Sequence, residues 1–592
     1  MQRRTFIRHS ATFGGAALAG LALGPVDSDA APAPARGNAG VRTDLVLRRA
    51  LIYDGAGGPP VRGDVAVSGG RIVEIGGELA TRGDREVDLS GLALAPGFID
   101  IHSHTDLVLL RDPRADSKVR QGVTTEVTGQ DGGSVGWSEA GFREARERYR
   151  QDGIEIDFRD VSGFLRHMDA RGAAVNVASM IGAGHVRGLV IGNADRPATD
   201  SEIARMVALV QAAIDGGACG LSSGLEYTPG AFADAAELQS LAGPLRGTGL
   251  PFASHMRNED DRLIAAIEEV IGVGHRAGVA VHISHLKAQG ERNWWKTDAA
   301  LRLIDDAATT GIDVDFDVYP YEAYATGLSN LFPVWAREGG TDSFMARLAD
   351  PATAPRIERA VRDKIAMLGS WDSVQMSSAS SPEYSWVAGG RLGTLAGQRR
   401  VEPYALLLDI IVGDRARTRM VGFGMNEENI ARKLAHPRSM VCSDGGAVSR
   451  RDGVPHPRNY GTFPRVLGRF VRELNALPLE QAIRKMSRMP ADRLRFTDRG
   501  RIEVDAVADL VAFDPATVAD RATFAEPHQF PVGIPHVIVS GVFVIENGDH
   551  TEARPGRAVR PGRAVRPGAA VRPGGAVRPG GAVRPGGAVR PA

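Results

Sequence analysis

The sequence predicts an α/β fold in which a (β/α)8 barrel carries a smaller β-sandwich. Eight apolar, β-rich segments alternate with amphipathic helical stretches over residues 98–497. Short β-rich runs separated by Gly-rich turns flank this region on both sides, at residues 42–97 and 498–553. Each flanking group is too small to be stable alone, so we expect the two groups to pair into one β-sandwich.

Composition places the chain among soluble enzymes. Of its 592 residues 43% are hydrophobic and 24% are charged, and the formal net charge is zero. A neutral chain lacks the electrostatic signature of a protein that binds nucleic acid or an anionic membrane, so we expect neither partner. The two cysteines, Cys219 and Cys442, both lie in apolar runs. We therefore expect small buried side chains and no disulfide framework.

The two ends of the chain have compositions that exclude them from the fold. Residues 2–8 contain an Arg-Arg pair, and the Gly- and Ala-rich apolar run 11–23 follows. This pattern predicts a twin-arginine export signal within residues 1–35, because the run is too short for a membrane span. We expect export to the periplasm, the exterior or the cell envelope. Residues 554–592 repeat Arg-Pro-Gly-x-Ala-Val every six residues, which predicts a disordered basic tail.

The barrel prediction depends on eight strands in chain order. They are the run into His102, Thr125–Thr128, Val175–Met180, Cys219–Ser223, Pro251–His255, Val279–His285, Val314–Tyr319 and Ser439–Asp444. Helical runs such as 201–217 and 262–278 separate them. About 120 residues lie between the last two strands, too many for one connection. We expect an insertion at about 325–415 that forms a lid over the barrel mouth.

Ionisable side chains recur at the carboxyl ends of these strands, where a barrel places its active site. The candidate ligands are His102, His104, Asp131, His255, His285 and Asp444. His102 and His104 alternate along one strand and so point the same way. Histidine is scarce, with 14 in the chain, so four at strand ends favour a transition-metal site such as zinc. Asp131 also fits a plain turn residue before two glycines.

Several stretches resemble the D-aminoacylase family of the amidohydrolase superfamily. They are Pro96-Gly-Phe-Ile-Asp-Ile-His-Ser-His104, Gln121-Gly-Val-Thr-Thr125, Gly220-Leu-Ser-Ser-Gly-Leu-Glu-Tyr227, Ser254-His-Met-Arg-Asn-Glu259, Ile283-Ser-His-Leu-Lys287, Ser443-Asp-Gly445, His456-Pro-Arg-Asn-Tyr-Gly-Thr-Phe-Pro-Arg-Val-Leu467 and Ala508-Asp-Leu-Val-Ala-Phe-Asp-Pro-Ala-Thr-Val-Ala-Asp520. The resemblance covers about residues 42–557. It implies a metal-dependent hydrolase barrel that uses one or two zinc ions to cleave N-acyl-D-amino acids into a carboxylate and a free D-amino acid.

One segment departs from the family pattern. Where well-known members have a cysteine that binds metal, this chain has Gly129-Gln-Asp-Gly132, which places Asp131 at that position. A carboxylate binds zinc and also bridges two ions. The number of ions and the preferred metal therefore stay open at this point.

Amide hydrolysis also needs a proton shuttle and a group that binds the substrate carboxylate. Asp444 is our candidate shuttle, with a metal ligand or a helix cap as the alternatives. For the carboxylate we single out Arg257, Lys287, Tyr319 and Tyr321. Arg257 and Lys287 each follow a candidate ligand by two residues, so strand alternation would point them to the same side. Either could instead form a surface ion pair.

Two other functions compete with this interpretation. The same site could act on cyclic amides or dipeptides, but relatives of that kind often carry a carboxylated lysine, and no lysine stands at a suitable strand end. A non-catalytic protein that binds the cell envelope through its basic tail is the third possibility, which the full set of candidate ligands disfavours. No sequence feature specifies an oligomeric state.

Overall fold

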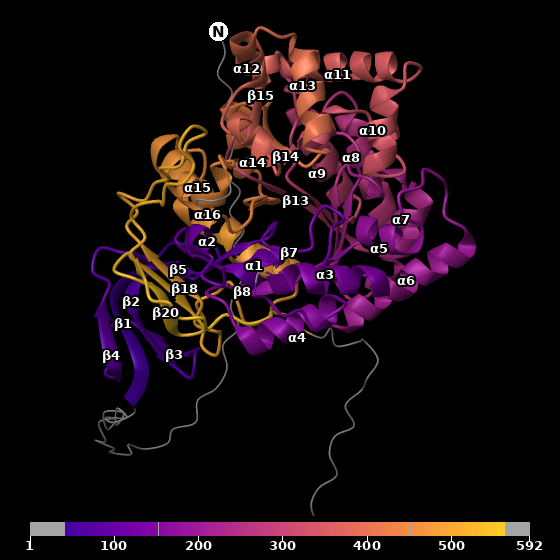
Figure 1. Cartoon of the computed structure of the whole chain (residues 1–592). Coiled ribbons are helices and arrows are strands. Elements are labelled where there is room, and N and C mark those ends of the chain that lie inside the picture. Colours follow the sequence, from indigo (N-terminus) through magenta and orange to yellow (C-terminus); the bar gives the residue numbers. More distant parts are fainter. Residues whose placement is uncertain (1–41, 152, 450–452, 563–592) are drawn as a thin grey trace, which may run out of the picture.

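The computed structural model describes residues 42–151, 153–449 and 453–562 (Figure 1). The predicted export signal and residues 563–592 lie outside the described residues. Two units are apparent in Figure 1: a β domain built from both ends of the chain, and a barrel with a helical insertion. One connection between the two units is a single residue, since β5 ends at Pro96 and the first barrel strand begins at Phe98.

Eight parallel segments form the predicted barrel. They are β6 (Phe98–Asp100), β7 (Val123–Thr128), β8 (Asn176–Ser179) with β9 (Ile181–Gly182), β10 (Leu221–Gly224), β11 (Pro251–His255), β12 (Ala280–Ile283), β13 (Val314–Val318) and β17 (Ser439–Val441). The order β6-β7-β8 and the order β17-β13-β12-β11-β10-β9 join through the short link at Met180. A parallel bridge between Ser103 and Gly445 closes the ring. The (β/α)8 fold predicted from the sequence is thereby confirmed.

Apolar faces and capping residues explain where the surrounding helices form and where they begin and end. The helix α8 (Leu263–Ala277) buries Ala266, Ile267 and Val270 against the barrel and ends at Gly278 in the left-handed conformation. The helix α6 (Asp200–Asp215) begins with a capping box between Thr199 and Glu202. The other helices outside the insertion are α1 (Val108–Arg111), α2 (Asp116–Val119), α3 (Glu139–Gln151), α4 (Val161–Arg171), α5 (Ala183–Val190), α7 (Ala235–Ala242), α9 (Lys296–Thr309), α14 (Glu427–Ala435), α15 (Arg458–Arg465), α16 (Leu479–Met486) and α17 (Arg488–Arg493).

The β domain combines the two flanking regions, as predicted. Its strands are β1 (Arg42–Ile52), β2 (Val61–Ser68), β3 (Arg71–Gly76), β4 (Arg82–Asp88), β5 (Ala93–Pro96), β18 (Leu510–Phe513), β19 (His536–Val539), β20 (Val542–Glu546) and β21 (Asp549–His550). The antiparallel pair β5 and β18 joins the two chain ends, and hydrogen bonds link all nine strands into one sheet. Leu47, Val65, Leu510 and Ile538 come from both ends and share one buried core.

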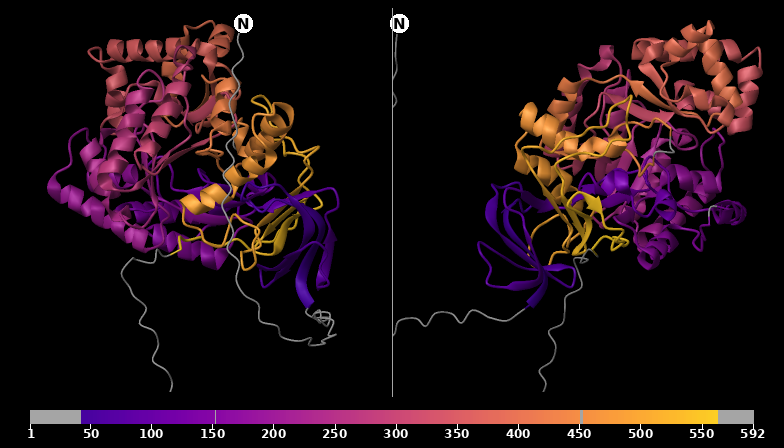
Figure 2. Two further views of the ribbon diagram at one scale, coloured as in Figure 1. Left: turned by 180° about the vertical axis from the view of Figure 1, so that it is seen from behind. Right: turned by 60° about the vertical axis from the view of Figure 1, so that its left-hand side comes forward.

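The long interval between β13 and β17 contains a separate α/β unit. Its elements are β14 (Ala323–Gly327), α10 (Thr341–Ala349), α11 (Ala354–Leu368), β15 (Val374–Ser378), α12 (Leu392–Arg399), α13 (Pro403–Gly413) and β16 (Arg419–Phe423). The three strands form an antiparallel sheet in the order β14-β16-β15. This insertion therefore extends slightly beyond the predicted range of 325–415. Figure 2 shows its helices at the opposite end of the molecule from the β domain.

Residues 554–562 correct the prediction that the whole repeat tail is disordered. The backbones of Gly556 and Val559 pair with Ala173 and Val177, beside the start of β8. The Val559 side chain is buried in the same core cluster as residues of the barrel interior, and Arg560 forms an ion pair with Asp169. We call residues 554–562 the strap. Composition does not reveal the strap because Pro-Gly units have no periodic apolar face, and its order comes from backbone pairing with residues that are distant in the sequence.

Two further expectations concern burial. Cys219 and Cys442 are buried free thiols, as predicted, and burial raises the pKa of Cys219 to about 12. Among the described residues, no helix has both the length and the apolar character needed to cross a bilayer.

Candidate metal centre

A cavity of about 1350 Å³ opens at the carboxyl ends of the barrel strands. Barrel loops supply one wall, with His104, Asp131 and Asp444, and the insertion supplies another, with Thr326, Ser378 and Arg419 among others. The volume exceeds that of a typical ligand pocket, so an acylated amino acid fits inside it. The cavity is therefore placed where a barrel enzyme carries its reaction centre.

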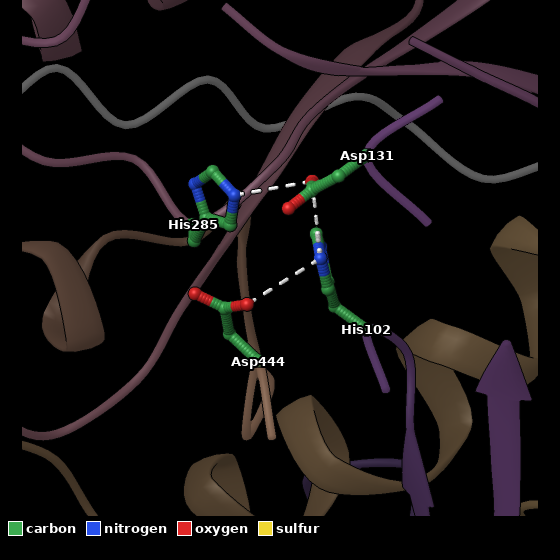
Figure 3. A group of neighbouring side chains, drawn as sticks. All are labelled: His102, Asp131, His285 and Asp444. Carbon is green, nitrogen blue, oxygen red and sulfur yellow. Dashed lines mark hydrogen bonds and ion pairs between the residues drawn. The ribbon is translucent and has the colours of Figure 1, made fainter. Parts of the chain in front are cut away.

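Five of the six candidate ligands from the sequence meet on four buried strand ends, and the sixth comes from the loop after β7. His102, Asp131, His285 and Asp444 offer ligand atoms that all lie within 4.8 Å of one another (Figure 3). His255 and His285 form a second such group with Glu259. His104 completes the set, with its Nε2 3.1 Å from Oδ1 of Asp444. The structure thus brings together all six residues that sequence reasoning singled out.

The carboxylate of Asp131 lies at the centre of this group. Its Oδ1 is 3.3 Å from Nε2 of His102 and 3.3 Å from Nε2 of His285. Its Oδ2 is 3.4 Å from Nε2 of His104 and 3.5 Å from Nδ1 of His255. Burial alone would raise the pKa of Asp131, but the surrounding histidines, led by His102, hold it well below its usual range. Because each carboxylate oxygen of Asp131 faces two imidazoles, this side chain could serve as a ligand of two metal ions.

The backbone at this centre has unusual torsion angles. Asp131, His285 and Asp444 have φ values of +54°, +34° and +49°, in the left-handed region that non-glycine residues seldom occupy. Each such residue carries a conformational cost of about 1–3 kcal/mol. Because three of the six residues share this feature, the surrounding barrel holds them in place for a purpose other than stability.

The donor set fits a divalent transition metal. Both ring nitrogens of His102 are fully buried and lack a hydrogen-bond partner, and so does Nε2 of His255. A buried polar atom without a partner costs about 1–3 kcal/mol, which a coordinated ion would offset. Imidazole nitrogens with carboxylate oxygens are the ligands that zinc prefers when thiolates are absent.

Asp444 has a second buried partner that the sequence analysis missed. Its Oδ2 accepts a hydrogen bond from Nη1 of Arg458 at 2.7 Å, and both side chains are almost fully buried. Burial opposes the charge, but Arg458 and then His285 lower the pKa of Asp444 far below its usual value, so the carboxylate is ionised at neutral pH. Arg458 lies in the His456–Leu467 stretch that carries the family resemblance, which was the available signal.

Glu259 is a further residue that sequence reasoning did not assign. Its Oε1 lies 3.1 Å from Nδ1 of His285, on the side of the ring away from Asp131. The same carboxylate accepts hydrogen bonds from Lys287 at 2.6 Å and from Gln289 at 3.0 Å. Nζ of Lys287 lies 2.7 Å from the same Nδ1, so Glu259 and the lysine that it binds both hold this edge of the ring, while Nε2 faces the other ligands. Glu259 therefore orients His285.

Asp317 plays a similar part beneath the centre. It accepts hydrogen bonds from the backbone N–H of His285 at 2.5 Å and from Nε2 of His282 at 2.6 Å, and it lies 3.7 Å from Nδ1 of His102. Desolvation opposes protonation of His282, but Asp315 and Asp317 on either side raise its pKa to about 9. The resulting imidazolium holds Asp317 in place. Asp317 in turn contacts the backbone of His285 and faces the ring of His102.

The structure corrects the predicted positions of Arg257 and Lys287. Arg257 binds the carboxylate of Glu269 and the carbonyls of Ala231 and Ala233, and it does not line the cavity. Lys287 is buried in its ion pair with Glu259. Strand alternation fails for both because β11 ends at His255 and β12 ends at Ile283, so neither residue is in a strand.

The two tyrosines are also placed differently from the prediction. Tyr319 and Tyr321 are buried behind His285, around a small pocket separate from the main cavity. The Tyr321 hydroxyl lies 3.5 Å from Asp520, while the Tyr319 ring carries Arg458 at 5.0 Å from its centroid. The tyrosine that does line the cavity is Tyr227, whose ring centroid is 4.7 Å from that of His255.

Comparisons with known proteins agree with this geometry. Residues 85–545 match the model of the amidohydrolase family. A D-aminoacylase and an N-acyl-D-aspartate deacylase, both from Alcaligenes xylosoxydans xylosoxydans, are each 35% identical to the chain, over 87% and 88% of its length and 97% and 96% of theirs. A crystal structure of N-acyl-D-glutamate deacylase from Bordetella bronchiseptica, complexed with zinc and a phosphonate inhibitor that mimics the tetrahedral intermediate, superposes with a TM-score of 0.74 at 33% identity, covering 88% of this chain and all of that one. The chain therefore belongs to the amidohydrolase family, within its group of D-aminoacylases and N-acyl-D-amino-acid deacylases.

Proposed function

We propose that this protein hydrolyses the amide bond of N-acyl-D-amino acids and releases a carboxylate and a free D-amino acid. The observation that carries the proposal is the cluster of four histidines, Asp131 and Asp444 at the barrel mouth, where His104, Asp131 and Asp444 line the cavity. The relatives named above act on substrates of this class, and this chain aligns with nearly the whole length of each of them.

Zinc, as one or two ions, is the metal we assign to the site. His102, His104, His255, His285 and Asp131 would hold it, and the unpartnered nitrogens of His102 and His255 support that assignment. A bound divalent ion lowers the pKa of a water molecule and polarises the carbonyl of the substrate. The central carboxylate of Asp131, in place of a thiolate, gives the site a harder ligand.

Asp444 acts as the proton shuttle. Its low pKa keeps it ionised, so Oδ1 can accept the proton of the attacking water and return it to the departing nitrogen. The hydrogen bond from Arg458 to Oδ2 fixes the carboxylate and leaves Oδ1 facing His104 and the ligand group. The alternative role as a ligand is tested by the metal content of the variant described below.

Arg458 is the group best placed to bind the α-carboxylate of the substrate. It lines the cavity, and its Nε has no hydrogen-bond partner although it is buried. Nη2 makes only a long hydrogen bond of 3.3 Å to the carbonyl of Ala325. Nε and Nη2 together form the edge of a guanidinium that binds a carboxylate in two places. This role replaces the one predicted for Arg257 and Lys287.

We also propose that the protein is exported by the twin-arginine route. The support is the Arg-Arg pair followed by a short Gly- and Ala-rich apolar run at residues 2–23. A site built from many buried ligands is best loaded before export, and this route carries folded proteins. A fusion of residues 1–41 to a reporter checks it: replacing Arg3 and Arg4 by lysine should stop export.

The first experiment measures release of free amino acid from N-acetyl-D-methionine and N-acetyl-L-methionine by zinc-loaded protein. We expect turnover of the D substrate alone, loss of activity after chelation, and recovery when zinc is restored. Turnover of neither substrate by protein that holds zinc would refute the proposal. Hydrolysis of a dipeptide or a cyclic amide by that same protein would then replace it.

A further inference from the structure

The cavity contains an arginine that has no anionic partner. Arg419 is the first residue of β16, where it pairs with Gly327 of β14 and with Ser378 of β15, and all three residues line the cavity. Among the described residues, no carboxylate lies within ion-pair distance of its guanidinium, and it makes no side-chain hydrogen bond. The side chain is surrounded by protein yet exposed to the solvent of the cavity.

Three other cations near this site each have a carboxylate partner. Arg458 binds Asp444, Lys287 binds Glu259, and Lys364 binds Asp260. Arg419 differs, and desolvation followed by the charge of Arg458 lowers its pKa from the usual value. Three arginines line this cavity, Arg111, Arg419 and Arg458. Arg111 lies over the ring of Tyr149 and Arg458 lies beside a carboxylate of the protein, whereas Arg419 has none beside it in the described part of the chain. An unpaired guanidinium that lines a cavity can bind an anionic ligand there.

The connectivity of the substrate decides which carboxylate each arginine receives. The α-carboxylate is separated from the scissile nitrogen only by Cα, so it must lie beside the reaction centre. Arg458 contacts Asp444 of that centre, whereas Arg419 comes from the sheet of the insertion and does not contact any candidate metal ligand. A carboxylate that reaches Arg419 must therefore stand further along the substrate, and the side chain is the part of the amino acid that carries one.

We propose that Arg419 binds a side-chain carboxylate and that the preferred substrates are N-acyl-D-amino acids with an acidic side chain. This inference rests on the proposed function and narrows it. Overall identity does not select a side chain, because a D-aminoacylase and an N-acyl-D-aspartate deacylase are equally identical to the chain. Gly327 opposite Arg419 has no side chain, which leaves space above the strand for the guanidinium and its ligand.

The test compares N-acetyl-D-glutamate with its neutral isostere N-acetyl-D-glutamine. Wild-type protein should have a kcat/KM at least about 10-fold higher for the glutamate substrate, mostly through KM, because a charged hydrogen-bonded pair discriminates by about 10- to 100-fold. Arg419→Gln should lose that advantage and leave the glutamine substrate within about threefold of wild type. Arg417→Gln, which changes an exposed arginine two residues away, is the matched control and should retain the preference.

Two results would overturn the assignment. Equal kcat/KM values for the two substrates in wild type would do so, and so would an equal loss on both substrates in Arg419→Gln. Arg419→Lys keeps the charge and should retain part of the preference, which separates charge from folding. Turnover of the glutamine substrate without preference would refute only this inference. No turnover of either D substrate would refute the proposed function itself.

Discussion

The two ends of the barrel differ in how well their buried polar groups and backbone are satisfied. At the carboxyl end, His102 and His255 bury ring nitrogens without partners, and Asp131, His285 and Asp444 have positive φ. At the opposite end, the strap pairs its backbone with residues 173–177 and buries Val559, and Arg560 meets Asp169. At the carboxyl end, the unpartnered nitrogens and the strained backbone lower the stability of the fold and hold side chains in place for a ligand. At the other end, the contacts of the strap contribute to stability.

The largest effect should come from Asp444→Asn at the carboxyl end. The amide keeps the shape but cannot accept a proton, so kcat should fall by about 10²- to 10⁴-fold. Zinc content, measured by atomic absorption, should stay near that of wild type. A parallel loss of zinc and activity would make Asp444 a metal ligand rather than the shuttle.

Removal of the strap tests the other end. Deleting residues 554–592 should lower the free energy of unfolding by about 2 kcal/mol or more, since Val559 alone contributes about that much through burial. A thermal melt followed by circular dichroism measures the shift. Deletion of residues 563–592 is the matched control, because it keeps every strap contact described above. Equal midpoints for the two truncations would show that the strap does not stabilise the barrel.

A smaller effect is expected from Glu259→Gln, which acts on the centre without touching substrate. Weaker orientation of His285 should reduce zinc affinity by about 10- to 100-fold in a competition titration with a chromophoric chelator. Glu269→Gln breaks the ion pair of Arg257 instead and should leave zinc affinity unchanged. Unchanged affinity in both variants would remove Glu259 from the positioning role.

A further effect concerns pH and the far end of the barrel. Desolvation lowers the pKa of Lys485 to about 7, where its amino group lies against the carbonyl and hydroxyl of Ser439. Between pH 7 and about 10 the unfolded chain then binds the proton that the folded chain has lost, so this lysine makes stability rise with pH. Lys485→Met should flatten the stability profile in that window relative to wild type. An unchanged slope in urea unfolding measurements would mean that Lys485 stays protonated.

The same contrast explains what could be predicted from the sequence. Local sequence patterns predict the barrel, the paired β regions and the six residues of the centre. Each strand end and each histidine can be recognised within a single short segment of the sequence. Arg458 and Glu259 were missed as site residues because their contacts with Asp444 and His285 join segments that are distant or separated by turns. Those partners emerge only when the chain closes into a barrel.

The errors arose where regular structure stops. The alternation rule was extended past the end of β11 to Arg257 and past the end of β12 to Lys287, although His285 already turns the backbone with φ +34°. The strap was missed for the opposite reason. Its residues have no helix or strand of their own, and they are held by backbone hydrogen bonds with residues 173–177 at the start of β8.

The sequence of the strap has a genetic consequence. Residues 554–562 read Arg-Pro-Gly-Arg-Ala-Val-Arg-Pro-Gly, and residues 560–568 repeat the same nine residues. Loss of residues 554–559, one unit of the repeat, would place an identical nonapeptide directly after Ala553. The chain therefore carries a second copy of the strap sequence, so contraction by one unit leaves residues able to make every contact of the strap.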